Sequence, residues 1–245
     1  MLGQRRAISL AGLERRSDPP WGTTPRAMVD WALALGARGI QIDAAMDGTR
    51  ARDLDQSARR DLAAVIRRAG ATCSGLDLWI PPSHFAEPAR QSRAADAVRE
   101  ACGFAADLRR LGAIEGQPVV SIATHADSPA GVLDRLVLDA EHVGARVADH
   151  RWPMAPTPRM GIGIDAAAVL LSGDDPARAV TAMVEPPAAA RLSDMTSVGR
   201  CVAGQGRLKI DEYVVALSVA RYAGWLVVDL RGLPDQENAA RALIG

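Results

Sequence analysis

The stretch Trp225-Leu226-Val227-Val228-Asp229-Leu230-Arg231-Gly232 decides the fold. Its four leading apolar residues, two of them β-branched, predict a strand buried on both faces, as in parallel sheets. The run stops on a carboxylate, and in parallel α/β folds ligands bind at the carboxyl ends of the strands. The same pattern recurs upstream at residues 161–165 and 190–194. The chain is therefore predicted to repeat one strand–helix unit and to gather polar strand ends at one mouth.

Strand-like and helix-like runs alternate along the whole chain. The first three expected strands contain Ser9, Asp43 and Asp77 at equal intervals, which match the length of one strand–loop–helix–loop unit. Strict alternation predicts a parallel sheet, and eight units fit a (β/α)8 TIM barrel, an α/β fold of one domain over residues 1–245. The expected strands are residues 7–10, 39–43, 73–80, 118–125, 146–150, 161–165, 190–194 and 225–229. The expected helices are residues 25–35, 57–68, 90–111, 129–143, 176–184, 211–222 and 237–244.

The segment between the fifth and sixth expected strands breaks this alternation. Residues 151–160 contain three prolines, which prevent a helix. The interval from Asp149 to Asp165 is also about half the interval from Asp165 to Asp194. One helix of the barrel is therefore expected to be reduced or missing here.

The composition excludes some functions and favours a cytoplasmic location. Lys+Arg and Asp+Glu are both 29, whereas nucleic-acid binding normally requires a basic surplus. Lys209 is the only lysine and precedes an expected helix, which excludes a Schiff-base aldolase. An odd number of widely spaced cysteines suits a reducing compartment (Cys73, Cys102 and Cys201). No signal peptide or membrane span is apparent, so we expect neither membrane nor nucleic-acid partners.

Several short motifs, in their order along the chain, resemble the xylose-isomerase-like sugar phosphate isomerase/epimerase family of barrels. The motifs are residues 78–85 and 105–113 in the first half, then Gly161-Ile162-Gly163-Ile164-Asp165, Gly173-Asp174-Asp175-Pro176, Arg191-Leu192-Ser193-Asp194, Gly204-Gln205-Gly206 and 224–229. The resemblance covers most of the chain. It implies an isomerase or epimerase that acts on a small sugar or sugar phosphate.

The resemblance also implies a divalent metal, Mn, Mg, Co or Zn, held by ligands at strands five to eight. The matching positions are Asp149 or His150, then Asp165, and finally Asp229 in place of a glutamate. The metal would polarise a sugar carbonyl while side chains shuttle the proton, which makes Asp165, Asp229 and His150 the expected catalytic residues.

At strand seven the family's histidine is replaced by Arg191, which cannot bind a metal. A second histidine of the pattern, three residues after Asp165, is replaced by Ala168. We therefore hypothesise that the Arg191 guanidinium substitutes electrostatically for the ion and pairs with Asp165 or Asp229. On this hypothesis the metal is absent.

Polar residues at strand ends and in the loops that follow are expected to contact the substrate. These residues are His84, His125, Arg191, Asp194 and Arg231. Each has a structural alternative, since aspartates at strand ends also form ion pairs or cap loops. The Gly204-Gln205-Gly206 turn could cradle a phosphate, or its glycines could serve a tight turn.

Two further functions compete with the isomerase or epimerase. A degenerate, non-catalytic barrel that binds a small molecule or a protein would explain Arg191 and Ala168. A DNA-repair nuclease on the same fold would need a histidine-rich zinc cluster, and four scattered histidines argue against it. The sequence leaves the substrate and the oligomeric state open.

Overall fold

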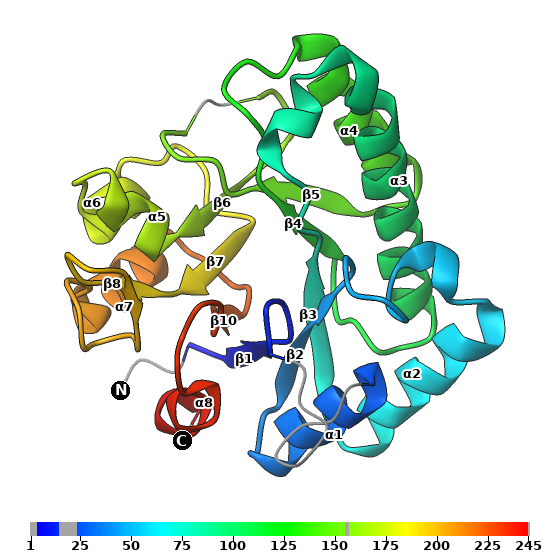
Figure 1. Ribbon diagram of the computed structural model, residues 1–245, viewed down its shortest axis with the longest axis horizontal. Coiled ribbons are helices and arrows are strands. Elements are labelled where there is room, and N and C mark those ends of the chain that lie inside the picture. The colour runs from blue at the N-terminus through cyan, green and yellow to red at the C-terminus, as the bar shows by residue number, and fades with distance from the viewer. Residues whose placement is uncertain (1–3, 15–23, 155–156, 245) are drawn as a thin grey trace.

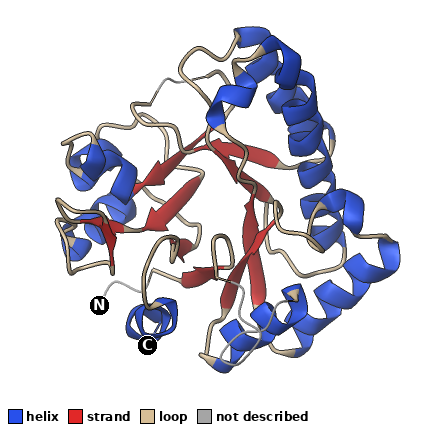
Figure 2. Cartoon of the chain, viewed as in Figure 1, coloured by secondary structure: helices blue, strands red, loops and turns tan. Residues whose placement is uncertain are grey.

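The computed structural model describes residues 4–14, 24–154 and 157–244. Eight parallel strands close into a barrel in the order β1, β2, β3, β4, β5, β6, β7, β10, which confirms the expected TIM barrel (Figures 1 and 2). The strands are β1 (Arg6–Ser9), β2 (Gly39–Asp43), β3 (Thr72–Asp77), β4 (Val119–Ile122), β5 (Arg146–Asp149), β6 (Gly161–Asp165), β7 (Ala189–Leu192) and β10 (Leu226–Val228).

Helices surround this barrel, and most of them begin where the sequence predicts. They are α1 (Pro25–Ala34), α2 (Gln56–Arg68), α3 (Pro88–Arg110), α4 (Ala130–His142), α5 (Ala166–Leu171), α6 (Pro176–Thr181), α7 (Ile210–Val219) and α8 (Gln236–Ile244), with short 3-10 turns η1 (Ala51–Asp53) and η2 (Pro82–Phe85). Thr24 and Asp175 cap α1 and α6 through their side chains, each followed by a proline at the first helical position. None of the described helices has the length and apolar character needed to cross a bilayer.

The second half of the barrel is the less regular one. Between β5 and β6, the described residues 150–154 and 157–160 form no helix, as the prolines predict. Two departures were not predicted. Strand β6 is followed by two short helices, α5 and α6, instead of one. After β7, the chain forms a small antiparallel hairpin, β8 (Asp194–Met195) with β9 (Arg200–Cys201), on the same side of the molecule as α5, α6 and α7 (Figure 1).

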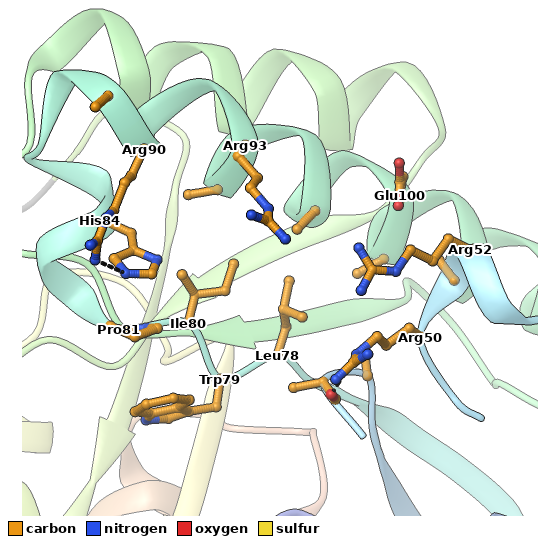
Figure 3. Close-up of a pocket in the computed structure, with 17 residues that line it drawn as sticks. Arg50, Arg52, Leu78, Trp79, Ile80, Pro81, His84, Arg90, Arg93 and Glu100 are labelled. Atoms are coloured by element: carbon orange, nitrogen blue, oxygen red, sulfur yellow. Dashed lines mark hydrogen bonds between the residues drawn. The ribbon is translucent and has the colours of Figure 1, made fainter. Parts of the chain in front are cut away.

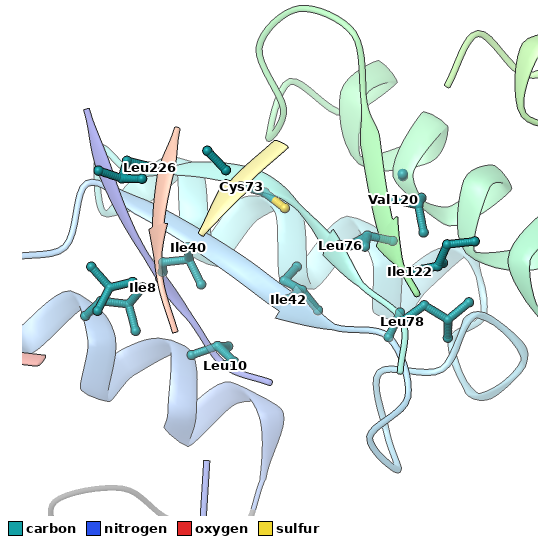
Figure 4. Close-up of a cluster of buried hydrophobic side chains, with 14 of the residues drawn as sticks. Ile8, Leu10, Ile40, Ile42, Cys73, Leu76, Leu78, Val120, Ile122 and Leu226 are labelled. Carbon is teal, nitrogen blue, oxygen red and sulfur yellow. The ribbon is translucent and has the colours of Figure 1, made fainter. Parts of the chain in front are cut away.

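Alternate residues of the strands divide between an apolar cluster and a polar barrel interior. The apolar cluster includes Ile8, Ile40 and Leu76, which are fully buried beside the helices (Figure 4). Several of the intervening positions carry buried polar residues, and Ser9 Oγ lies 2.9 Å from Gln41 Oε1 across neighbouring strands. Buried polar groups need partners. The interior and its mouth are therefore the part of the fold where hydrogen-bonding chemistry concentrates.

Candidate active site

Arg191 of β7 joins two carboxylates at the mouth of the barrel. Its Nη1 lies 3.3 Å from Asp165 Oδ2, and its Nη2 pairs closely with Asp77 Oδ2. Asp165 is the register neighbour of Arg191, whereas Asp77 comes from β3 on the other side of the barrel. All three side chains are buried. The guanidinium therefore ties β3, β6 and β7 together across the mouth.

A second cluster forms around Asp229, which follows β10. Arg231 approaches the Asp229 carboxylate through Nε at 2.9 Å and Nη2 at 2.7 Å, and Arg200 Nη2 lies 2.8 Å away. Although burial raises the pKa of Asp229, the charges of Arg231 and Arg200 hold it well below its ordinary value. Arg231 Nη1 also lies 3.5 Å from Asp77 Oδ1, so the two clusters form one network. We call this network, Asp77, Asp165, Arg191, Arg200, Asp229 and Arg231, the mouth network.

His150 lies inside the barrel beneath this network. Its Nε2 is 3.1 Å from Ser121 Oγ, and its ring fits against Gly163, where an added Cβ would lie 2.5 Å from the imidazole Cδ2. Burial lowers the pKa of His150 well below its ordinary value, and the positive charges of Arg191 and Arg231 lower it further. The imidazole is therefore neutral near pH 7. The motif Gly161-Ile162-Gly163 needs its second glycine because this ring occupies the space of a side chain.

Two predicted site aspartates hold loops in place. Asp149 Oδ1 accepts hydrogen bonds from the backbone N–H of Thr124 at 2.9 Å and of Arg151 at 3.1 Å, and its Oδ2 lies 2.5 Å from Thr124 Oγ1. Asp194 accepts from the backbone N–H of Gly204 and Gly206, both at 2.9 Å. The glycine amides that could have cradled a phosphate are directed at Asp194, and Gly204 has a φ of 88°, which suits the tight-turn alternative.

The two remaining predicted histidines lie outside the mouth network. His84 is in η2, where its Nε2 lies 2.7 Å from Arg90 Nη1. His125 is partly exposed, and its Nδ1 lies 3.6 Å from Asp127 Oδ2. Of the predicted residues, the structure thus brings together Asp165, Arg191, Asp229 and Arg231 in one network, with His150 below them.

Several residues of the mouth carry little signal in the sequence. Asp77 was noted only as a recurring strand end, yet it bridges Arg191 and Arg231. Its register partner Asp43 is half-buried, and burial together with the charge of Asp77 raises the pKa of Asp43. Arg200 was missed altogether because it comes from the unpredicted hairpin. The equal intervals between Ser9, Asp43 and Asp77 were the one sequence signal that pointed to this side of the mouth.

The residues present do not fit the metal site that the resemblance implies. Asp165 and Asp229 are paired with arginines, and the Asp149 carboxylate faces Thr124. Across residues 4–14, 24–154 and 157–244, no group of three or more His, Cys, Asp or Glu side chains is arranged to hold a metal ion. Arg191 pairs with Asp165, as hypothesised. The second partner of Arg191 is Asp77 and not Asp229.

The chain matches no model of a known protein family and no curated protein. Its fold is similar to a xylose isomerase domain protein from Planctomyces limnophilus, with a TM-score of 0.72, 15% identity and coverage of 97% of this chain and 93% of that one. It is also similar to a sugar phosphate isomerase/epimerase from Parabacteroides distasonis, with a TM-score of 0.66, 12% identity and coverage of 98% and 92%. A third similar structure is a probable 3-DHS dehydratase from Bacillus anthracis, with a TM-score of 0.68, 12% identity and coverage of 98% and 97%. At these identities the likeness establishes the fold alone, a TIM barrel.

Proposed function

We propose that this chain is an isomerase or epimerase of a small sugar or sugar phosphate that works at the barrel mouth without a resident metal. The observation that carries the proposal is the Arg191 guanidinium fixed between Asp77 and Asp165. It provides a permanent positive charge where the resemblance expects a metal ligand. The similar barrel titled sugar phosphate isomerase/epimerase supports the reaction class by analogy of fold.

The proposed reaction is a proton transfer next to a sugar carbonyl. Removing the proton from the adjacent carbon leaves negative charge on the carbonyl oxygen, and fixed guanidinium donors stabilise such an oxyanion. Arg231 is suited to this role because its side chain is still 22% exposed at the mouth. Return of the proton to the neighbouring carbon completes an isomerisation, and its return to the opposite face of the same carbon completes an epimerisation.

Two groups are suited to carry the proton. Asp43 is half-buried at the end of β2, and its raised pKa makes its carboxylate a better base than Asp229, whose pKa is lowered by the neighbouring arginines. His150 is a weaker base than a free imidazole, because burial and the nearby arginines lower its pKa, but its neutral ring retains a nitrogen that can accept a proton. In an isomerisation the group that takes the proton returns it, so the enzyme ends the cycle unchanged. In an epimerisation one group takes the proton and a protonated group on the opposite face delivers another, and proton exchange with water then restores both groups.

Solvent-deuterium exchange, followed by NMR, tests this proposal directly. We expect chelator-treated protein to exchange the proton next to the carbonyl of a substrate from an aldose, ketose and sugar-phosphate panel. Asp43→Asn should slow the exchange at least about 100-fold, the usual contribution of a general base. Asp47→Asn, a nearby exposed carboxylate, is the matched control. Exchange that requires added Mn, Mg, Co or Zn would refute the metal-free site.

A non-catalytic barrel is the second candidate, and the saturation of the mouth favours it. Asp165 and Asp229 both bond to arginines, so neither carboxylate is free for chemistry. Saturable sugar binding without any deuterium exchange would support this candidate over the enzyme.

The role of Arg191 is tested separately by Arg191→His. Stoichiometric metal binding by a folded variant would support the hypothesis that the arginine substitutes for a metal ion. Unfolding of the variant without metal binding would count against that hypothesis.

A further inference from the structure

A cavity of about 750 Å³ lies outside the mouth network, between α3 and the loops that follow β2 and β3 (Figure 3). Its apolar floor comes from Leu78 and Ile80, with Ala94, Ala97 and Ala101 of α3 along one wall. Trp79 lies at its edge with 60% of its surface exposed. Ligand-binding pockets usually have volumes of roughly 300–1,000 Å³ and mainly apolar linings, and this cavity, here called the outer pocket, meets both criteria.

The outer pocket is strongly basic although the whole chain is neutral. It is lined by the arginines Arg50, Arg52, Arg90 and Arg93, and its one acidic lining residue is Glu100. In Figure 3 the Arg93 side chain extends from α3 toward Leu78 and Ile80, and Arg50 and Arg52 lie to the right of Leu78. The positive charge therefore converges over an apolar floor.

These arginines differ in how firmly the protein already holds them. Arg90 is engaged by Glu87 at 3.2 Å and by His84 at 2.7 Å. Arg52 has only a 3.8 Å contact with the adjacent Asp53. Arg93 has no hydrogen bond or salt bridge with any residue in the described ranges. Two guanidinium groups are thus left with donors to offer a ligand.

We propose that the outer pocket binds a small organic phosphate that carries a flat ring, a ligand of the nucleoside-phosphate class. A phosphate dianion matches the excess of guanidinium groups, which bind its oxygens in bidentate geometry. The alanine face of α3 and the leucine and isoleucine of the floor accept a flat apolar body, and the exposed Trp79 indole offers a stacking surface. The site is separate from the mouth network and does not depend on the proposed enzymatic activity.

Isothermal titration of the full chain with AMP, adenosine and inorganic phosphate tests the proposal. We expect saturable AMP binding, with adenosine and inorganic phosphate each at least about tenfold weaker, because each lacks one half of the interaction. Arg93→Gln should weaken AMP binding by about tenfold or more, the value of a charge-assisted hydrogen bond. Arg68→Gln on α2 is the matched control, since Arg68 is also exposed and does not line the pocket.

A variant that fills the pocket tests whether AMP binding depends on the shape of the cavity as well as on the charge of its arginines. Ala97 is half-buried in the pocket wall, and Ala97→Phe should remove AMP binding while every arginine remains. Absence of saturable AMP binding to the wild-type chain would overturn the proposal. So would AMP binding that neither Arg93→Gln nor Ala97→Phe weakens, because the ligand would then lie elsewhere. Inorganic phosphate that binds as tightly as AMP would mean an adventitious ion only and would also overturn it.

Discussion

The mouth network and the outer pocket use arginine in opposite ways. In the mouth, Arg191 and Arg231 are buried or nearly so, and each is bonded to carboxylates from other strands or from its own loop. In the outer pocket, Arg93 is exposed and pairs with none of the described residues. Burial explains the difference, because an unpaired charge in the interior costs several kcal/mol whereas water solvates a surface guanidinium. Paired arginines hold the barrel together, and unpaired ones remain available for a ligand.

The largest loss of stability is expected from Arg191→Gln, which tests the paired arginines of the mouth. The substitution leaves the Asp77 and Asp165 carboxylates buried without their shared counter-ion. Breaking a buried ion pair from one side costs about 3–5 kcal/mol, and urea unfolding should report a loss of that size. The double variant Asp77→Asn with Arg191→Gln should lose less than the sum of the two single variants. Strict additivity would mean that the two side chains do not interact.

A smaller loss of stability is expected from Gly163→Ala, which tests the position of His150 below the network. The new Cβ would lie 2.5 Å from the imidazole Cδ2, so the ring must move within a closed interior. Overpacking of this kind costs about 1–3 kcal/mol in the free energy of unfolding. Gly103→Ala on α3 is the control: a Cβ there meets no atom within 4 Å, so this variant should gain about 0.5–1 kcal/mol. Equal stability of the two variants would contradict the placement of His150.

The pH dependence of stability gives a third test of the mouth. Because the folded-state pKa of His150 is lowered, the unfolded chain binds a proton at this histidine below about pH 6.5 and the folded chain does not. Stability should therefore fall as the pH drops below that value, by at most about 1.4 kcal/mol per pH unit from this group. His150→Gln should flatten this slope in urea titrations between pH 5 and 7, whereas the exposed His142→Gln should keep it. A slope unchanged in His150→Gln would assign the dependence to other groups.

The sequence was sufficient for the barrel because each strand carries its own local signal. The run that ends at Asp229 and the run at residues 161–165 are apolar, short and followed by turn residues, and both became strands within a residue or two of the expected bounds. The hairpin β8–β9 escaped prediction because strands of two residues have no periodicity to recognise. The helix expected over residues 129–143 begins at Ala130 with Pro129 before it, and Ser128 accepts a hydrogen bond from the backbone N–H of His125.

The site was less predictable because its partners come together only when the barrel closes. Asp77 and Arg191 are far apart in the chain, and nothing local to either residue indicates the other. The arginine-rich composition hid the outer pocket in the same way. Arg50, Arg52 and Arg93 come from two separate segments, and a uniform excess of arginine over lysine gave no reason to group them. Strand ends are local information, whereas charge pairing across a barrel depends on topology.

The smallest change in stability should come from Arg93→Gln, which makes the same chemical change as Arg191→Gln but at an exposed position. With no ion pair to lose, its free energy of unfolding should stay within about 0.5 kcal/mol of the wild type in urea unfolding. A slight gain is the expected sign, because Arg52 and Arg90 lie around the same cavity and removing one like charge relieves their repulsion. That gain should vanish at high salt, which screens exposed charges. A loss of several kcal/mol would mean that Arg93 is a structural counter-ion like Arg191, and the distinction between paired and available arginines would fail at the position where it is sharpest.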